Sequence, residues 1–300
     1  MWSRAELARV APALFIAVLV LQSCAAARGP TLDELRNATI TSLPGGAVSL
    51  RDGVFEAAPL QPGSPSRRRV VLSPQPLAVG HLAGVRGKST VALFSISEGG
   101  TGNLVYVGIF RLQSGRATDM AVALVGDRVQ VRTLGIVDGA VILDVVEAGP
   151  GDAMCCPGQL ARKSYGFRGG TLRLASSSVT GRLSLAALAD ATWTLVSLDR
   201  LPISGVDRPP TAVIEGSRLS GFGGCNRYTG QVAEKSPGDI VVGPLAATKM
   251  ACPAPAMELE SRFLAAMSRM TRYSFVDGRL VLSTIEGGAP QELMFERGAR

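Results

Sequence analysis

The sequence predicts a mainly β protein of the α+β class, built from two antiparallel β-rich domains. Turn-forming residues are abundant, with 35 Gly and 18 Pro among 300 residues. Short apolar runs that end in turn residues recur along most of the chain. Helical periodicity is nearly absent, apart from one stretch near residue 260. The composition, 46% hydrophobic and 18% charged, is typical of a globular chain rather than a disordered one.

The N-terminal segment has the three parts of a secretory signal. Arg4 and Arg9 form a basic leader, the apolar run from Val10 to Leu21 follows, and small residues close it at positions 23–27. About 20 apolar residues are needed to span a bilayer as a helix, and this run is shorter. We therefore predict a signal peptide at residues 1–23 rather than a permanent transmembrane helix.

The end of this leader resembles the lipobox of bacterial lipoproteins. It reads Leu21-Gln22-Ser23-Cys24, and the resemblance implies that Cys24 carries acyl chains, such as palmitate, and becomes the new N-terminus. Ala25 after this cysteine is similar to the class sorted to the outer membrane, facing the periplasm, in cells with two membranes. The alternative is ordinary cleavage at Ala25-Ala26-Ala27, which would release a soluble secreted protein.

Removal of the leader leaves 277 residues, enough for two ordinary domains. We expect a flexible tether at residues 24–34, a first domain at 35–178 and a second at 186–300. Ser176-Ser177-Ser178 interrupts the apolar pattern and is expected to be a linker, so the boundary is placed near residue 180.

The first domain is predicted to be a meander of antiparallel strands. Gly126-Asp127, Asp138-Gly139 and Gly169-Gly170 have the residue types of two-residue hairpin loops, so the strands on either side of each are expected to pair. The expected strand runs are Thr90 to Ile96, Leu104 to Leu112, Met120 to Val125, Val129 to Val137, Val141 to Val146 and Ser164 to Leu174.

The second domain is predicted to hold short strands and one amphipathic helix. Strands are expected at Thr192 to Leu198 and near Thr211, Arg218, Gln231, Ile240 and Thr248. Apolar residues from Ala256 to Met270 recur at spacings of three and four, so this helix should lie on the sheet. A last hairpin is expected to turn at Asp277-Gly278, and Leu293 to Phe295 closes the domain.

Four motifs of the second half resemble the META domain, the family of the heat-shock protein HslJ. They are Trp193-x-Leu195, the run from Gly224 to Gly230, the run from Thr248 to Pro253, and Met257-x-x-Glu260-x-x-Phe263. The resemblance covers residues 191–296 and implies a compact sheet with one packed helix, in envelope proteins linked to stress and antibiotic tolerance. It carries no catalytic residues. The motif positions of interest are Trp193, Gly224, Cys225, Asn226, Gly230, Thr248, Met250, Cys252, Pro253 and Glu260.

The strongest features of the first half are Asn37-Ala38-Thr39, the run from Gly126 to Gln130, and Leu143 to Val146 leading into Gly149 to Pro157. With them, residues 35–174 resemble the uncharacterised region that precedes META domains in other predicted lipoproteins. Relatives of that region often carry an Asp-rich loop suited to calcium, which needs oxygen ligands. Here the corresponding stretch, Gly80 to Gly87, has no carboxylate. Calcium is therefore not expected.

Four cysteines remain if Cys24 is acylated, and an oxidising compartment favours their pairing. Cys225 and Cys252 belong to two META motifs, and a bridge between them would close a loop of 27 residues. Cys155 and Cys156 are adjacent and could form a vicinal disulfide, a possible redox switch. Two reduced thiols, or a pairing between the halves, are the alternatives for that pair.

Several kinds of chemistry lack support in the sequence. Adjacent cysteines and one histidine, His81, match no zinc spacing, and no nucleophile elbow of a serine hydrolase is present. Glu258 and Glu260 lie two positions apart on a helix and do not face each other. With 5% aromatic residues the chain has few stacking groups for nucleic acid. Arg67-Arg68-Arg69 is predicted to be a solvated loop, with an anionic membrane surface as the alternative.

We therefore expect a non-catalytic lipoprotein of the cell envelope with a structural or binding role and no cofactor. No small-molecule substrate or metal is indicated, and the protein partner is unidentified. A second hypothesis is an inhibitor or assembly helper that captures an envelope protein by adding a strand to an open sheet edge. An enzyme would have to work without histidine chemistry.

Overall fold

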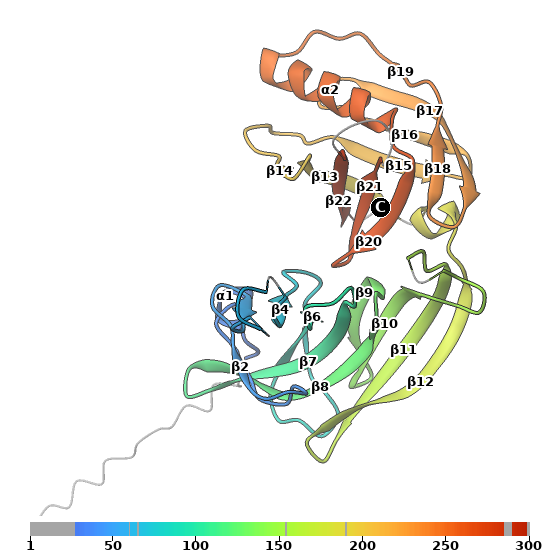
Figure 1. Ribbon diagram of the computed structural model, residues 1–300. Coiled ribbons are helices and arrows are strands. Elements are labelled where there is room, and N and C mark those ends of the chain that lie inside the picture. Colours follow the sequence, from blue (N-terminus) through green and yellow to red (C-terminus); the bar gives the residue numbers. More distant parts are fainter. Residues whose placement is uncertain are drawn as a thin grey trace, which may run out of the picture.

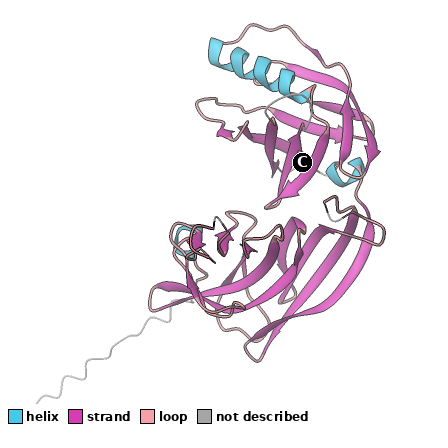
Figure 2. Ribbon diagram, in the orientation of Figure 1, coloured by secondary structure: helices cyan, strands magenta, loops and turns pink. Residues whose placement is uncertain are grey.

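The computed structural model describes residues 28–59, 61–64, 66–153, 155–189, 191–284 and 290–298. The expected signal peptide and Cys24 lie outside these residues. Two β-rich halves follow each other along the chain and meet at one end of each (Figure 1). Strands dominate both halves and one long helix lies on the second (Figure 2), as the sequence predicts.

The first half begins with a large sheet. Its strand order is β2-β1-β8-β7-β6-β4-β3, with β5 beside β6. Pairing is antiparallel except between β1 and β8. The strands are β1 Thr39–Ile40, β2 Val48–Ser49, β3 Val54–Glu56, β4 Arg69–Leu72, β5 Ala78–Gly80, β6 Ser89–Ser97, β7 Leu104–Gln113 and β8 Arg116–Asp127.

A second, four-stranded sheet completes the first half in the order β12-β11-β10-β9. Its strands are β9 Gln130–Val137, β10 Ala140–Glu147, β11 Gln159–Arg168 and β12 Thr171–Arg182. The large sheet is buried on both faces. On one face, residues such as Val107 form a core with Leu143 of the second sheet. On the other face, Phe94 belongs to a separate core that also contains Ile40 of β1. Burial on both faces explains the nearly continuous apolar runs of β6 and β7.

The second half is a closed antiparallel sheet. The path β13-β15-β16-β17-β18-β20-β21-β22 returns to its start because β13 also pairs with β22. The strands are β13 Thr192–Leu198, β14 Leu201–Pro202, β15 Thr211–Glu215, β16 Arg218–Phe222, β17 Arg227–Ser236, β18 Asp239–Val242, β19 Ala246–Ala247, β20 Arg272–Val276, β21 Arg279–Ser283 and β22 Glu292–Gly298. Closure removes the edges of the main sheet, so the expectation of an open sheet was wrong for this half.

Helix α2, Ala254–Met267, is the predicted amphipathic helix. Its buried residues are Phe263, Ala266 and Met267, and the Phe263 ring packs edge-on against Tyr228 and Phe295 of the sheet. The helix begins two residues earlier than predicted. Pro253 takes the capping position and Pro255 the first turn, where a missing N–H costs no helical hydrogen bond.

Three of the four predicted hairpin turns are confirmed. Asp138-Gly139, Gly169-Gly170 and Asp277-Gly278 all have positive φ at both positions, as type I′ turns require, and their flanking strands pair. The turn at Gly126-Asp127 was wrong. There β8 ends in the large sheet and β9 begins in the other, so the chain crosses between sheets instead of folding back.

The linker expected at Ser176-Ser177-Ser178 was also wrong. These serines lie inside β12, where they pair with β11 and expose their side chains. A polar run on a solvated strand face looks like a linker in the sequence, although its backbone is fully used in the ladder. The two halves are joined further on, through the short helix η1, Leu185–Leu188, whose two leucines are buried in the core of the second half.

The expected flexible tether at 24–34 is folded over its described part, residues 28–34. Helix α1, Leu32–Leu35, begins with a capping box between Thr31 and Glu34. Glu34 also accepts two hydrogen bonds from Arg28, and the Thr90 hydroxyl donates to the carbonyl of Pro30 at 2.6 Å. These contacts hold the start of the described chain against the large sheet.

Candidate functional site

The polar META-motif residues form one hydrogen-bonded cluster. The Glu260 carboxylate on α2 accepts from the backbone N–H groups of Cys225 and Asn226 and from Nδ2 of Asn226. Oδ1 of Asn226 in turn accepts from the Thr248 hydroxyl at 2.8 Å and from the N–H of Met250 at 2.7 Å. The motif residues therefore bind the helix, the turn before β17 and the segment after β19 to one another.

A disulfide between Cys225 and Cys252 lies beside this cluster, with Cα atoms 5.9 Å apart. Cys225 is buried, and it begins the turn that Glu260 holds. The pairing that the motifs implied is thus the one in the structure. It connects the same two segments as Asn226 does, so the covalent and hydrogen-bonded links reinforce each other.

The remaining motif residues have packing roles. Trp193 is fully buried and its Nε1 donates to the carbonyl of Leu188 at 3.0 Å, which ties η1 to the closed sheet. A side chain at Gly230 would place its Cβ 2.9 Å from the carbonyl oxygen of Pro244, which favours glycine there. Gly224 has φ of 124°, a conformation that favours glycine, and Pro253 caps α2. The motif thus describes the architecture of this half, and the polar side chains of the cluster are hydrogen-bonded to one another.

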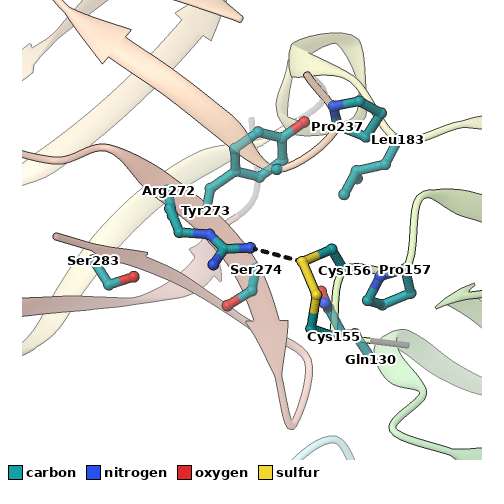
Figure 3. A pocket seen from close by; sticks show the side chains of 11 residues that line it. Gln130, Cys155, Cys156, Pro157, Leu183, Pro237, Arg272, Tyr273, Ser274 and Ser283 are labelled. Carbon is teal, nitrogen blue, oxygen red and sulfur yellow. Dashed lines mark hydrogen bonds between the residues drawn. A yellow bond between two sulfur atoms is a disulfide. The ribbon is translucent and has the colours of Figure 1, made fainter. Parts of the chain in front are cut away.

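A cleft of about 310 Å³ lies where the two halves meet (Figure 3). The first half contributes Gln130 and the segment Cys155 to Pro157, and Arg272, Tyr273 and Ser274 of β20 form the opposite side. Further lining residues are Leu183, Pro237, Gly238 and Ser283.

Cys155 and Cys156 are joined as a vicinal disulfide at the mouth of this cleft. Nη2 of Arg272 lies 3.5 Å from Sγ of Cys156 (Figure 3). Its Nε lies 3.3 Å from a carboxylate oxygen of Asp239. The vicinal arrangement is thus the one that the structure adopts among the alternatives for these cysteines. The cleft combines a disulfide, a guanidinium group and serine hydroxyls, which can bind a small polar or anionic group.

Tyr273 lies between the cleft and the hydrophobic core of the second half. Its hydroxyl donates to Glu234 at 2.6 Å, and burial followed by this hydrogen bond raises the pKa of Tyr273 well above its usual range. The phenol therefore stays protonated and acts as a fixed donor.

The two halves are also fastened beside the cleft by the β20–β21 hairpin. Oε1 of Gln130 accepts from the N–H of Phe275 at 2.8 Å, and the Gly278 N–H donates to the carbonyl of Val131 at 3.0 Å. Arg132 lies over the Phe275 ring at 5.2 Å and donates to the carbonyl of Ala187. The hairpin thus packs against β9 of the first half.

Comparison with protein families matches residues 186–297 to the META domain. A META domain is thus present at residues 186–297. A protein from Burkholderia xenovorans, solved by NMR, is 28% identical over 39% of this chain and 87% of its own, with a TM-score of 0.32. A second protein solved by NMR is 22% identical over 38% of this chain and 94% of its own, with a TM-score of 0.31. No curated protein matches the chain.

The META domain match covers the cluster around Asn226 and one side of the cleft, but not the cysteine pair at 155 and 156. Sequence reasoning missed Gln130, Arg272 and Tyr273 as cleft residues. They carry no local signal in the sequence, because β9 and β20 pair with strands of their own halves and meet each other only through tertiary contacts.

The other candidates of the sequence fall elsewhere. His81 and Glu258 are exposed and lie outside the cleft. The Arg67-Arg68-Arg69 run is a solvated loop only in part: Arg67 and Arg68 precede β4 and Arg67 is exposed, whereas Arg69 belongs to the strand. The three arginines form ion pairs with Glu56 and Glu98. Among the described residues no cluster of three His, Cys, Asp or Glu side chains is placed to hold a metal ion. No described helix is long and apolar enough to cross a membrane.

Proposed function

We propose that the chain is a non-catalytic lipoprotein of the bacterial cell envelope, in which a META domain serves a binding role linked to envelope stress or antibiotic tolerance. The observation that carries this proposal is the hydrogen-bonded cluster of Asn226, Thr248 and Glu260. Its polar groups satisfy one another, so the most distinctive residues of the chain maintain a scaffold rather than act on a substrate.

The lipid anchor is supported by the sequence around Cys24, and it gives the scaffold a location. Two acyl chains attach a protein to a membrane stably, whereas one alone binds reversibly. The expected place is the outer membrane, facing the periplasm, in a cell with two membranes.

The anchor is tested by fractionation of cells that express the chain or its Cys24→Ala variant. The unaltered chain should be found with the membranes and should carry the mass of acyl chains on its first residue. The variant should lack that mass and leave the lipoprotein fraction. An unchanged distribution and mass would contradict the proposal.

The binding role is tested by photo-crosslinking in intact cells. A photoreactive amino acid that replaces Ser283 would lie in the cleft. The same amino acid in place of Arg262, which is exposed on α2, is the control. A product formed from position 283 and not from 262 would support binding at the cleft. Turnover of a substrate by the purified chain would contradict a non-catalytic role.

A second candidate is the assembly helper, and strand β12 favours it. This strand pairs with β11 on one side, and much of its length is solvent-exposed, with Val179 65% exposed. Such an edge can accept an extended peptide as a further strand. A photoreactive group at Val179 that captures a partner, where position 283 captures none, would favour this candidate.

A further inference from the structure

A hollow of about 650 Å³ lies on the first half, away from the cleft, and it is lined by basic side chains. Arg86 and Lys88 come from the loop before β6, and Arg111 comes from the end of β7. The other lining residues are Arg28, Gly84, Val85, Ser89, Leu112, Gln113 and Met120. They include no acidic residue.

The charges of Arg86, Lys88 and Arg111 are not neutralised by any part of the chain that the structure describes. All three side chains belong to exposed residues and none takes part in an ion pair. Arg28 differs, since Glu34 binds it through two hydrogen bonds of 2.7 and 2.6 Å. Three free positive charges therefore surround one hollow, and its base includes the half-buried apolar residues Val85, Leu112 and Met120.

This hollow lies close in the chain to the proposed anchor. Arg28, which lines it, follows Cys24 by four residues, and four residues reach at most about 14 Å when fully extended. An acylated Cys24 would therefore hold the hollow next to the bilayer surface. Anionic headgroups attract basic residues at such a distance, and each contributes about five-fold to partitioning.

The ends of β6 and β7 that lie opposite the hollow face the META domain. Ser95 of β6 and Val105 of β7 lie beside Phe275 and Asp277 of the β20–β21 hairpin. The hollow adjoins the start of β6 and the end of β7. A bilayer at the hollow would thus leave the cleft and the META domain on the aqueous side (Figure 1).

We propose that Arg86, Lys88 and Arg111 form a docking surface for the anionic phospholipid headgroups of the membrane that holds the anchor. The surface would fix the orientation of the first half on the bilayer. This inference rests on the proposed lipoprotein nature for its geometry, and its charge argument stands on the hollow alone.

The test is hydrogen exchange of the acylated full-length chain on two kinds of vesicle, phosphatidylcholine alone and phosphatidylcholine with phosphatidylglycerol. Exchange at residues 82–88 and 113–116 should be slower on the anionic vesicles, and 0.5 M salt should remove most of this difference, because the charges are exposed. The triple variant Arg86→Glu/Lys88→Glu/Arg111→Glu should abolish the slower exchange on the anionic vesicles.

The matched control, Arg227→Glu/Lys249→Glu/Arg262→Glu, makes the same charge change at exposed META positions and should keep the protection. If the first triple variant loses its thermal transition, the corresponding glutamine variant replaces it. Equal exchange on both vesicles, protection that survives the triple variant, or equal protection by soluble glycerol phosphate would overturn the proposal.

If mass spectrometry finds no acyl chains on the protein, the proposed anchor is refuted. The docking surface can still be tested with the unacylated chain. The unacylated chain should sediment with phosphatidylglycerol vesicles, and the triple variant should bind roughly 100-fold less. Equal binding of the two would refute the docking surface alone.

Discussion

The carboxylate of Glu260 accepts a 2.8 Å hydrogen bond from Nδ2 of Asn226, which lies 34 positions earlier in the chain. Asn226 is 4% exposed, so its amide has little access to water and depends on this partner. The same carboxylate takes two backbone N–H groups at the turn before β17. One side chain of α2 therefore adds three hydrogen bonds to a glycine-rich turn that the Gly223 N–H also closes by donating to the carbonyl of Asn226.

Replacement of Glu260 by Ala should lower the free energy of unfolding by about 3 kcal/mol. The loss exceeds that of one ordinary hydrogen bond because three donors lose a charged acceptor. Urea denaturation followed by tryptophan fluorescence measures it, since Trp193 is in the core of the same half. Glu258→Ala is the matched control, because Glu258 is exposed on the same helix, and it should change stability by less than about 0.5 kcal/mol. Equal effects of the two variants would show that Glu260 has no special role.

The disulfide between Cys225 and Cys252 should contribute about 3.5 kcal/mol, because it closes a loop of 27 residues in the unfolded chain. The double variant Cys225→Ala/Cys252→Ala should show this loss without reductant. With reductant, the free energy of unfolding of the unaltered chain should fall towards that of the variant. The variant Cys155→Ser/Cys156→Ser is the control, since a bridge between neighbours closes almost no loop, and it should lose much less. A larger loss from the vicinal pair would contradict this entropic account.

Much of the fold could be predicted from local pattern. Strand β13 was found with its observed bounds, and the helix was placed within two or three residues at each end. The turn at Asp277-Gly278 was found because its residue types tolerate positive φ. These features depend on neighbours in the sequence, so the sequence contains their signal.

The features that were missed depend on distant partners. Strands β1 to β5 have two to four residues each among Pro and Gly, too few to show alternation. The serines of β12 were mistaken for a linker because only β11 reveals them as a strand. The cleft combines Gln130 with Arg272, which are far apart in the chain and meet only through the β20–β21 hairpin. Pairing across 140 residues has no local periodicity from which to infer it.

The junction between the halves should loosen when Gln130 is replaced by Ala. Oε1 of Gln130 accepts the Phe275 N–H, so the variant leaves a buried strand without that partner, at a cost of about 1 to 2 kcal/mol. Hydrogen exchange at Phe275 should accelerate. Gln231→Ala, at an exposed position of β17, should leave that amide unchanged. An unaltered exchange rate at Phe275 in both variants would mean that the hydrogen bond does not hold the halves together.

Asp277 makes the stability of the junction depend on pH. Burial raises the pKa of its carboxyl, and the opposing effects of the Ser73 hydroxyl and the Arg279 charge are smaller. The folded chain therefore binds this proton more tightly than the unfolded chain does. Its contribution to stability is fully present below the unfolded pKa of about 3.9 and is lost as the pH rises through the higher folded value.

Replacement of Asp277 by Asn removes this titration while keeping a residue that tolerates the positive φ of 52°. The free energy of unfolding of the variant, relative to the unaltered chain, should therefore increase between pH 3.5 and pH 7. Denaturant titrations across that range measure it. Asp138→Asn, in the same type of turn with an exposed side chain, is the matched control. If the Asp277→Asn difference stays constant or shrinks as the pH rises, burial of this carboxyl does not govern the junction.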